Sequence, residues 1–283
     1  MKRILGAHKS ISGGKAKAID RVVDIGGNSL QIFSSSPRGW SLPVDSDKEI
    51  NDFKKKKDEL GVDPVYFHAT YLVNLADGGE VGKKSKKKLV SELNLAKRLG
   101  VRGSIVHLGS FKSDEEQPAY KEDEYSVLVN NIKEVLDSSP SGTFLIAENS
   151  GTRKVGRYIK GLAQIIKDVN DNRFKICLDT CHMHAAGYNI STEKSLNSFL
   201  DDFDEQIGLD NLELWHLNDS KDNFGSLRDR HENIGEGEIG KQTFELLLNN
   251  PRTKNMPFII ETPGFDGKGP DKKNIDTLKS LIK

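Results

Sequence analysis

The chain has 283 residues, of which 35% are hydrophobic and 30% charged, so it can bury a core, and disorder throughout is excluded. Its 42 basic residues balance 42 acidic ones, which excludes a uniformly basic nucleic-acid coat, and no apolar run approaches the roughly 18 residues of a membrane span. Two cysteines do not indicate a disulfide framework and no signal peptide is visible, so we expect a cytoplasmic protein without membrane association.

Short apolar runs predict eight buried strands. In chain order they cover Arg3–His8, Ser29–Ser34, Val65–Ala69, Ser104–Gly109, Phe144–Asn149, Phe174–Asp179, Leu212–Asn218 and Phe258–Thr262. Amphipathic segments predict helices at Lys15–Ile25, Glu49–Leu60, Lys84–Leu99, Tyr125–Leu136, Tyr158–Val169, Leu196–Ile207, Lys241–Leu248 and Ile275–Ile282. The third of these helices is followed by Gly100, which stands where a terminating glycine belongs.

The alternation of strands and helices predicts the fold class. Eight strands rich in Val, Ile and Leu, in a chain of this length, indicate a closed (β/α)8 TIM barrel. No linker or shift in composition divides the sequence, so we expect residues 1–283 to form a single barrel domain. The alternative is an open doubly wound sheet, which usually shows a G-x-G-x-x-G loop after its first strand. The segment from Gly6 to Gly14 does not fit that pattern.

Six of the predicted strands run from apolar residues into one histidine or carboxylate. These residues are His68, His107, Glu148, Asp179, His216 and Glu261. Barrel strands point their C-terminal ends at a single face, where active sites lie. One such residue alone would most often be a hydrogen-bonded structural group. Three carboxylates meeting in a partly dry site would repel one another, and divalent metal ions remove that conflict.

Two local motifs extend this set. Asp179-Thr-Cys-His182 places Asp and His at a strand end and on the loop that follows, and Asp229-Arg-His231 is an extended pair that projects to one side. A catalytic zinc usually has about three protein ligands and an open position, so nine ligands suggest up to three ions with one carboxylate bridging. Five histidines with four carboxylates favour Zn²⁺, with Mn²⁺ or Fe²⁺ as alternatives, over Mg²⁺.

The other histidines and the cysteines have simpler interpretations. We interpret His8 and His184 as structural residues or as supports for the ligands. Cys177 and Cys181 could bind zinc, but Cys177 lies two residues before Asp179 on a strand and is interpreted as a packing residue.

Longer motifs resemble the endonuclease IV family of apurinic/apyrimidinic endonucleases. They run from residue 6 to residue 263 and include Gly6-Ala-His8, His68-Ala-Thr-Tyr-Leu-Val-Asn-Leu75, Leu178-Asp-Thr-Cys-His182, Ala185-Ala-Gly-Tyr188, His216-Leu-Asn-Asp-Ser220, Gly235-Glu-Gly237 and Ile260-Glu-Thr-Pro263. The resemblance implies a monomeric barrel that uses a trinuclear zinc site to cut duplex DNA 5′ to an abasic site. The products would be a 3′-hydroxyl and a 5′-deoxyribose phosphate, and family members also trim blocked 3′ ends.

The resemblance also distributes the nine residues over three ions. One zinc would be held by His68, His107 and Glu148, and the third by His182, Asp229 and His231. Glu148 would bridge to the second zinc, which is completed by Asp179, His216 and Glu261. As the bridging carboxylate, Glu148 is also the catalytic candidate, because it can orient the attacking water or accept its proton.

Three residues match DNA contacts of the family. Gln31-Ile-Phe33 followed by Arg38 resembles a loop that enters DNA, with Arg38 inserting into the base stack, and Tyr71 with Leu72 match a wedge beside the vacated position. The alternative for Tyr71 and Leu72 is simple loop packing. The sequence departs from the family at Thr70, where proline is frequent, and in the loops after His107 and Glu148.

Two other functions fit parts of the pattern. A metal-dependent sugar isomerase or epimerase on a related barrel also gathers His, Glu and Asp at strand ends, although around one or two ions. A catalytically silent barrel that binds abasic DNA would keep the DNA contacts without cleavage.

Overall fold

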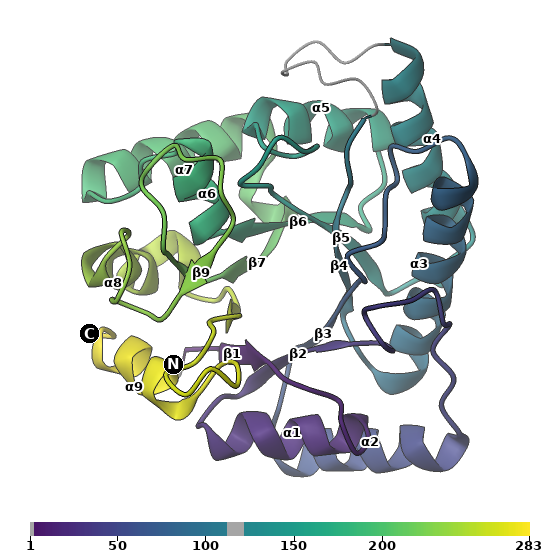
Figure 1. Ribbon diagram of the computed structural model, residues 1–283, viewed down its shortest axis with the longest axis horizontal. Helices are drawn as coiled ribbons and strands as arrows, with labels where there is room; N and C mark the ends of the chain where they lie inside the picture. Colours follow the sequence, from purple (N-terminus) through teal and green to yellow (C-terminus); the bar gives the residue numbers. More distant parts are fainter. Residues whose placement is uncertain (1–2, 112–121) are drawn as a thin grey trace.

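The structure, a computed structural model, describes residues 3–111 and 122–283 as a closed barrel of eight parallel strands with helices around its outside (Figure 1). The strands are β1 Leu5–His8, β2 Ser29–Phe33, β3 Val65–His68, β4 Gly103–His107, β5 Phe144–Glu148, β6 Phe174–Asp179, β7 Leu212–His216 and β10 Phe258–Ile260. Each pairs with its neighbours in chain order, and β1 closes the ring on β10. The predicted (β/α)8 class is therefore confirmed, and the open sheet is excluded.

The predicted helices are all present, with small differences at their ends. They are α1 Lys15–Asp24, α2 Asp47–Glu59, α3 Glu80–Leu99, α4 Glu122–Asp137, α5 Ile159–Val169, α7 Glu193–Gln206, α8 Lys241–Asn249 and α9 Lys272–Ser280. Short 3₁₀ turns at Leu209–Asn211 and Pro251–Thr253 lead into β7 and β10. Ser46 and Glu49 cap each other's backbone at the start of α2, and Gly100 ends α3 at φ 68°.

Three short elements were not predicted. The segment after β6, expected as a loop, forms helix α6 Thr180–Ala186, whose first turn is capped by the Asp179 carboxylate accepting from the His182 N–H at 3.0 Å. The strand-end aspartate thus supplies its own N-cap, and the chain turns helical at once. Strands β8 Asp219–Ser220 and β9 His231–Glu232 form a two-stranded antiparallel sheet that returns the chain to the barrel end. Two-residue strands are too short to show a periodic pattern.

The barrel interior is filled by one apolar layer. Six strands each contribute one fully buried side chain to this layer: Tyr66, Ile105, Ile146, Cys177, Leu214 and Ile259. At the N-terminal end of the barrel, the Tyr66 hydroxyl donates to the Glu213 carboxylate at 2.9 Å. Cys177 therefore packs as interpreted, and the polar strand ends lie beyond this layer. Among the described helices, none combines the length and apolar composition needed to cross a membrane.

We predict that Ile146→Ala lowers the free energy of unfolding by about 2–5 kcal/mol, because the rigid ring of strands cannot collapse around the cavity. Leu60→Ala is the control, since Leu60 is 45% exposed and should cost less than about 0.5 kcal/mol. Urea unfolding of both variants measures the difference. Equal costs would contradict an interior layer that supports the barrel.

Candidate metal centre

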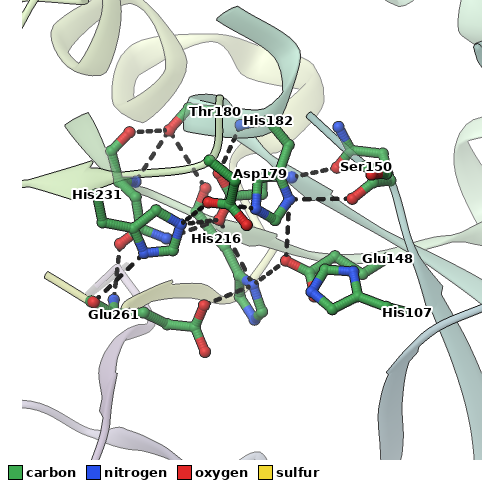
Figure 2. Close-up of polar contacts among 12 residues, drawn as sticks. His107, Glu148, Ser150, Asp179, Thr180, His182, His216, His231 and Glu261 are labelled. Atoms are coloured by element: carbon green, nitrogen blue, oxygen red, sulfur yellow. Dashed lines mark hydrogen bonds and ion pairs between the residues drawn. The ribbon is translucent and has the colours of Figure 1, made fainter. Parts of the chain in front are cut away.

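The polar strand ends meet at the C-terminal end of the barrel. His107, Glu148, Asp179 and His216 end β4 to β7, and Glu261 directly follows β10; Figure 2 shows these side chains converging, with His182 and His231 beside them. Ligand atoms lie within 4.8 Å of one another in three groups that match the predicted sets: His68, His107 and Glu148; Glu148, Asp179, His216 and Glu261; His182, Asp229 and His231. All nine residues proposed from the sequence are therefore brought together, although Cys181 also joins Asp179 and His231 in a further group.

Glu148 joins the first two groups. It is fully buried, and its Oε2 lies 3.1 Å from His68 Nε2 and 3.3 Å from His107 Nε2. Its Oε1 lies 2.9 Å from His216 Nδ1. Burial alone would raise the pKa of this carboxyl, but His107, His216 and His68 hold it well below its usual range. An ionised carboxylate thus faces a different cluster with each of its two oxygens.

In the third group, His182 lies on α6, His231 begins β9, and Asp229 lies two residues before His231. His182 Nε2 lies 3.1 Å from Asp229 Oδ1, and His231 Nε2 lies 3.3 Å from the same oxygen. Both nitrogens are buried, and Asp229 is their ion-pair partner, although neither meets the geometry of a hydrogen bond to a described residue. Two buried imidazole nitrogens converging on one carboxylate oxygen fit a divalent cation such as Zn²⁺, whose usual ligands are imidazole and carboxylate.

Burial and the nearby carboxylates shift the pKa values of the site's histidines in opposite directions. Burial would lower the pKa of His68, but the hydrogen bond to Glu148 and the nearby carboxylates raise it to about 9. Burial acts the same way on His231, whose pKa is raised to about 9 by Asp179 and Asp229. Burial dominates at His107 and lowers its pKa to about 4. The nearby carboxylates thus favour the protonated forms of His68 and His231, whereas burial favours the neutral form of His107.

Gln31 supports this centre and was misplaced by the sequence motif. The segment Gln31–Phe33 lies in β2, as the predicted strand Ser29–Ser34 required, and not in a DNA-entering loop as its motif suggested, and Gln31 is fully buried. Its amide nitrogen donates to Glu261 Oε1 at 2.5 Å, and its amide oxygen lies 2.7 Å from His216 Nε2. Since that oxygen can only accept, His216 must carry its proton on Nε2, which leaves Nδ1 to face the carboxylates. A polar residue inside an apolar strand was the available signal.

Two asparagines form hydrogen bonds that orient the candidate ligands. The sequence patterns did not single them out. Asn149 Oδ1 accepts from the Asp179 N–H at 2.6 Å, and its backbone oxygen lies 3.0 Å from His182 Nδ1. Asn218 donates to Asp179 Oδ2 at 2.7 Å and accepts from the Glu261 N–H at 2.7 Å. Each lies one or two residues after a ligand, so adjacency to a strand-end ligand was the signal.

The two remaining histidines lie outside the ligand groups. His8 Nδ1 is 3.4 Å from Glu261 Oε1 and 2.9 Å from the Gln31 amide nitrogen. His184 Nε2 is 3.1 Å from the Asp222 carbonyl oxygen. His8 thus touches a ligand and His184 anchors a loop, which agrees with their interpretation as supports or structural residues.

The proposed DNA contacts lie on loops at the same end of the barrel. Tyr71 is 73% exposed and Leu72 40% exposed, directly after the strand that ends in His68. The Tyr71 ring centre lies 6.3 Å from that of His68. Arg38 is exposed on the segment between β2 and α2. Their exposure disfavours simple packing, and contact with DNA stays a prediction.

Comparison with known proteins places the chain among relatives of this architecture. Residues 19–282 match the family model "Xylose isomerase-like TIM barrel". The chain is 37% identical over 283 residues to "Probable endonuclease 4" of Persephonella marina, covering 99% of this chain and 97% of that protein. It is 38% identical to the protein of the same name from Halothermothrix orenii, covering 97% and 99%.

Solved structures agree with these relatives. Endonuclease IV from Thermus thermophilus superposes with a TM-score of 0.84 at 31% identity, covering 98% of both chains. D-psicose 3-epimerase from Clostridium cellulolyticum superposes with a TM-score of 0.64 at 18% identity, covering 98% of this chain and 94% of the other. At that identity the likeness is one of fold alone.

We predict that Zn²⁺ binding at about pH 7 releases protons, and that the apparent affinity rises with pH toward about 9. His68 and His231, with pKa values of about 9, are protonated in the metal-free protein, whereas zinc needs neutral imidazoles. Titration calorimetry in two buffers of different ionisation enthalpy counts the protons. His231→Asn should release about one proton fewer than the unmodified chain, and His184→Asn should release the same number. A Zn²⁺ affinity that does not change between pH 7 and pH 9 would contradict the assignment.

Proposed function

We propose a function for this chain from one premise: it belongs to the endonuclease IV family. It is a DNA-repair endonuclease that hydrolyses the phosphodiester 5′ to an abasic site in duplex DNA, giving a 3′-hydroxyl and a 5′-deoxyribose phosphate. The observation that carries the proposal is the set of nine His, Asp and Glu residues in three groups, two of which share Glu148. The same centre would trim blocked 3′ ends, because both reactions break a phosphate ester.

The donor chemistry supports three zinc ions as the cofactors. The first site is His68, His107 and Glu148, the second adds Asp179, His216 and Glu261, and the third is His182, Asp229 and His231. Imidazole and carboxylate donors, three or four to a group, are typical of catalytic zinc, and Mn²⁺ or Fe²⁺ could substitute. Bound ions would supply the positive charge that neutralises phosphate oxygens and would activate water near neutral pH.

The protein's own residues perform the remaining tasks. Glu148 is buried and ionised between two groups, so it can orient the attacking water and accept its proton. Gln31 and the two supporting asparagines, Asn149 and Asn218, keep His216, Asp179 and Glu261 in place without reorganisation during the reaction. With 42 basic and 42 acidic residues, the chain has no global attraction for DNA, so local positive charge must bind the phosphates.

Selection of the lesion follows from the exposed rim. Tyr71 and Leu72 would enter the space of the missing base, and Arg38 would insert into the stack beside it. Unstacking costs least where a base is absent, so an abasic site is the easiest place for such a wedge to enter. The substrate is therefore distinguished by its deformability and not by its base sequence. We further propose that the chain acts as a monomer with a single barrel domain.

We predict that Glu148→Gln and Asp179→Asn each reduce incision of a duplex with one tetrahydrofuran site by about 10²-fold or more. Each change removes a buried charge from the ligand groups and keeps the side-chain shape. Glu205→Gln, the same change on the exposed surface of α7, should leave the rate unchanged. Metal content is measured on the same samples.

Three outcomes would contradict the proposed function. Glu148→Gln could cut at the wild-type rate without metal, or the metal-loaded wild type could bind the abasic duplex tightly without cutting it. Ketose interconversion in a coupled assay without DNA cleavage would support the sugar isomerase.

A further inference from the structure

A buried ion pair on α3 binds the loop between β2 and α2 on both sides of Arg38. Lys88 and Glu92 are each 1% exposed, and Lys88 Nζ lies 3.5 Å from Glu92 Oε1. Lys88 donates to Ser35 Oγ at 2.5 Å and to the Ser41 carbonyl oxygen at 2.8 Å, so one ammonium binds the chain on either side of Arg38.

The Glu92 carboxylate connects the same hydrogen-bond network to serines at strands β2 and β4. Glu92 Oε1 accepts from Ser34 Oγ at 2.7 Å, and Oε2 accepts from Ser104 Oγ at 2.7 Å. Ser34 directly follows β2, and Ser104 lies in β4. A buried ion pair is weak evidence for stability, because apolar residues could fill the same space at lower desolvation cost. Its polar bonds to one loop indicate that it fixes that loop's geometry.

Thr70 links this loop to the one that carries Tyr71 and Leu72. Its side chain is buried, and its hydroxyl donates at 2.5 Å to the carbonyl oxygen of Pro37, the residue before Arg38. The same hydroxyl oxygen accepts from the Leu72 N–H at 3.4 Å. A proline at this position would have no hydroxyl and could not make this bond.

A second contact joins the Tyr71 loop to the end of β2. The rings of Phe33 and Tyr71 meet edge to face, with centres 5.8 Å apart. Phe33 ends the strand that leads into the Arg38 loop, and Tyr71 follows the strand that ends in His68. The Tyr71 loop therefore contacts the Arg38 loop through a hydrogen bond and the end of β2 through an aromatic pair.

We propose that Thr70, supported by the Lys88–Glu92 pair, is a positioning residue that holds Arg38, Tyr71 and Leu72 as one preformed DNA wedge. The inference rests on the proposed function and deepens it. Two independently moving loops would lose conformational entropy when DNA orders them, and that loss would weaken binding. Loops already fixed to each other lose less, so the hydroxyl contributes to substrate binding and not to the bond-breaking step.

The experiment compares Thr70→Val with Thr253→Val on metal-loaded full-length protein. Thr253 is also a buried hydroxyl with a 2.5 Å hydrogen bond, to the Leu247 carbonyl oxygen, but it lies in the turn that precedes the N-terminal end of β10. We expect Thr70→Val to raise KM for the abasic duplex about five- to tenfold, with kcat within about twofold, since one neutral hydrogen bond is lost. Thr253→Val should leave both constants unchanged, and Thr70→Ser should restore KM.

An optical signal tests the wedge without catalysis. 2-Aminopurine placed beside a tetrahydrofuran site in an uncleavable phosphorothioate duplex brightens when its stack opens. At a protein concentration near the wild-type Kd, Thr70→Val should give a smaller increase than wild type or Thr253→Val, and at saturating protein the three increases should be equal. The double variant Lys88→Met with Glu92→Gln removes both charges at similar volume and should shift KM in the same direction. It carries the test should Thr70→Val fail to fold.

The outcomes separate this inference from the proposed function. If wild-type protein does not cut abasic DNA, the proposed function fails and the inference fails with it. If wild type cuts but Thr70→Val matches Thr253→Val in KM and fluorescence, only the inference is overturned. A fall in kcat with unchanged KM, or no rescue by Thr70→Ser, would also overturn it.

Discussion

Carboxylates buried side by side at one end of the barrel impose the constraint on which the rest of the site depends. Glu148 and Asp179 are fully buried, and Glu261 lies with them around His216. Like charges in a dry site repel strongly, so the arrangement persists only with positive charge between them. Protonation of His68 and His231 adds positive charge beside these carboxylates, and divalent cations would add more and leave open positions for substrate.

The barrel keeps the buried carboxylates apart from the apolar layer that stabilises the fold. The layer of Tyr66, Ile146 and their neighbours fills the interior with apolar side chains, and the polar residues begin only at the strand ends. The closed ring of strands fixes the spacing of those ends, which isolated loops could not do. Residues such as Gln31 and Asn218 then orient individual ligands by hydrogen bonds. Burial provides the stability of the barrel, while directed polar contacts provide the geometry of the site.

The division between an apolar interior and polar strand ends also decides how much of the fold and of the site could be predicted from the sequence. The strands and their terminal ligands were readable because buried parallel strands are continuous apolar runs, and His68 or Glu148 at the end of one stands out. Helix α6 was missed because its cap, Asp179, already had a role as a ligand. Gln31 was placed in the predicted strand Ser29–Ser34, but its contacts to His216 and Glu261 were missed because the motif that contains it was compared with a DNA-entering loop. The contact between Thr70 and Pro37 joins residues far apart in sequence, and no local pattern reports such a contact.

The barrel itself does not decide the chemistry. Sugar epimerases share this fold with TM-scores of 0.64 to 0.68 at 16–19% identity, so strand order and closure are common to proteins with different substrates. What differs must lie in the residues at the rim. Glu148 sits between two ligand groups and defines where the reaction would occur, whereas Tyr71 and Arg38 stand on loops that define what can approach. The proposed difference in substrate class therefore rests on these loops, which a buried ion pair and the Thr70 hydroxyl contact.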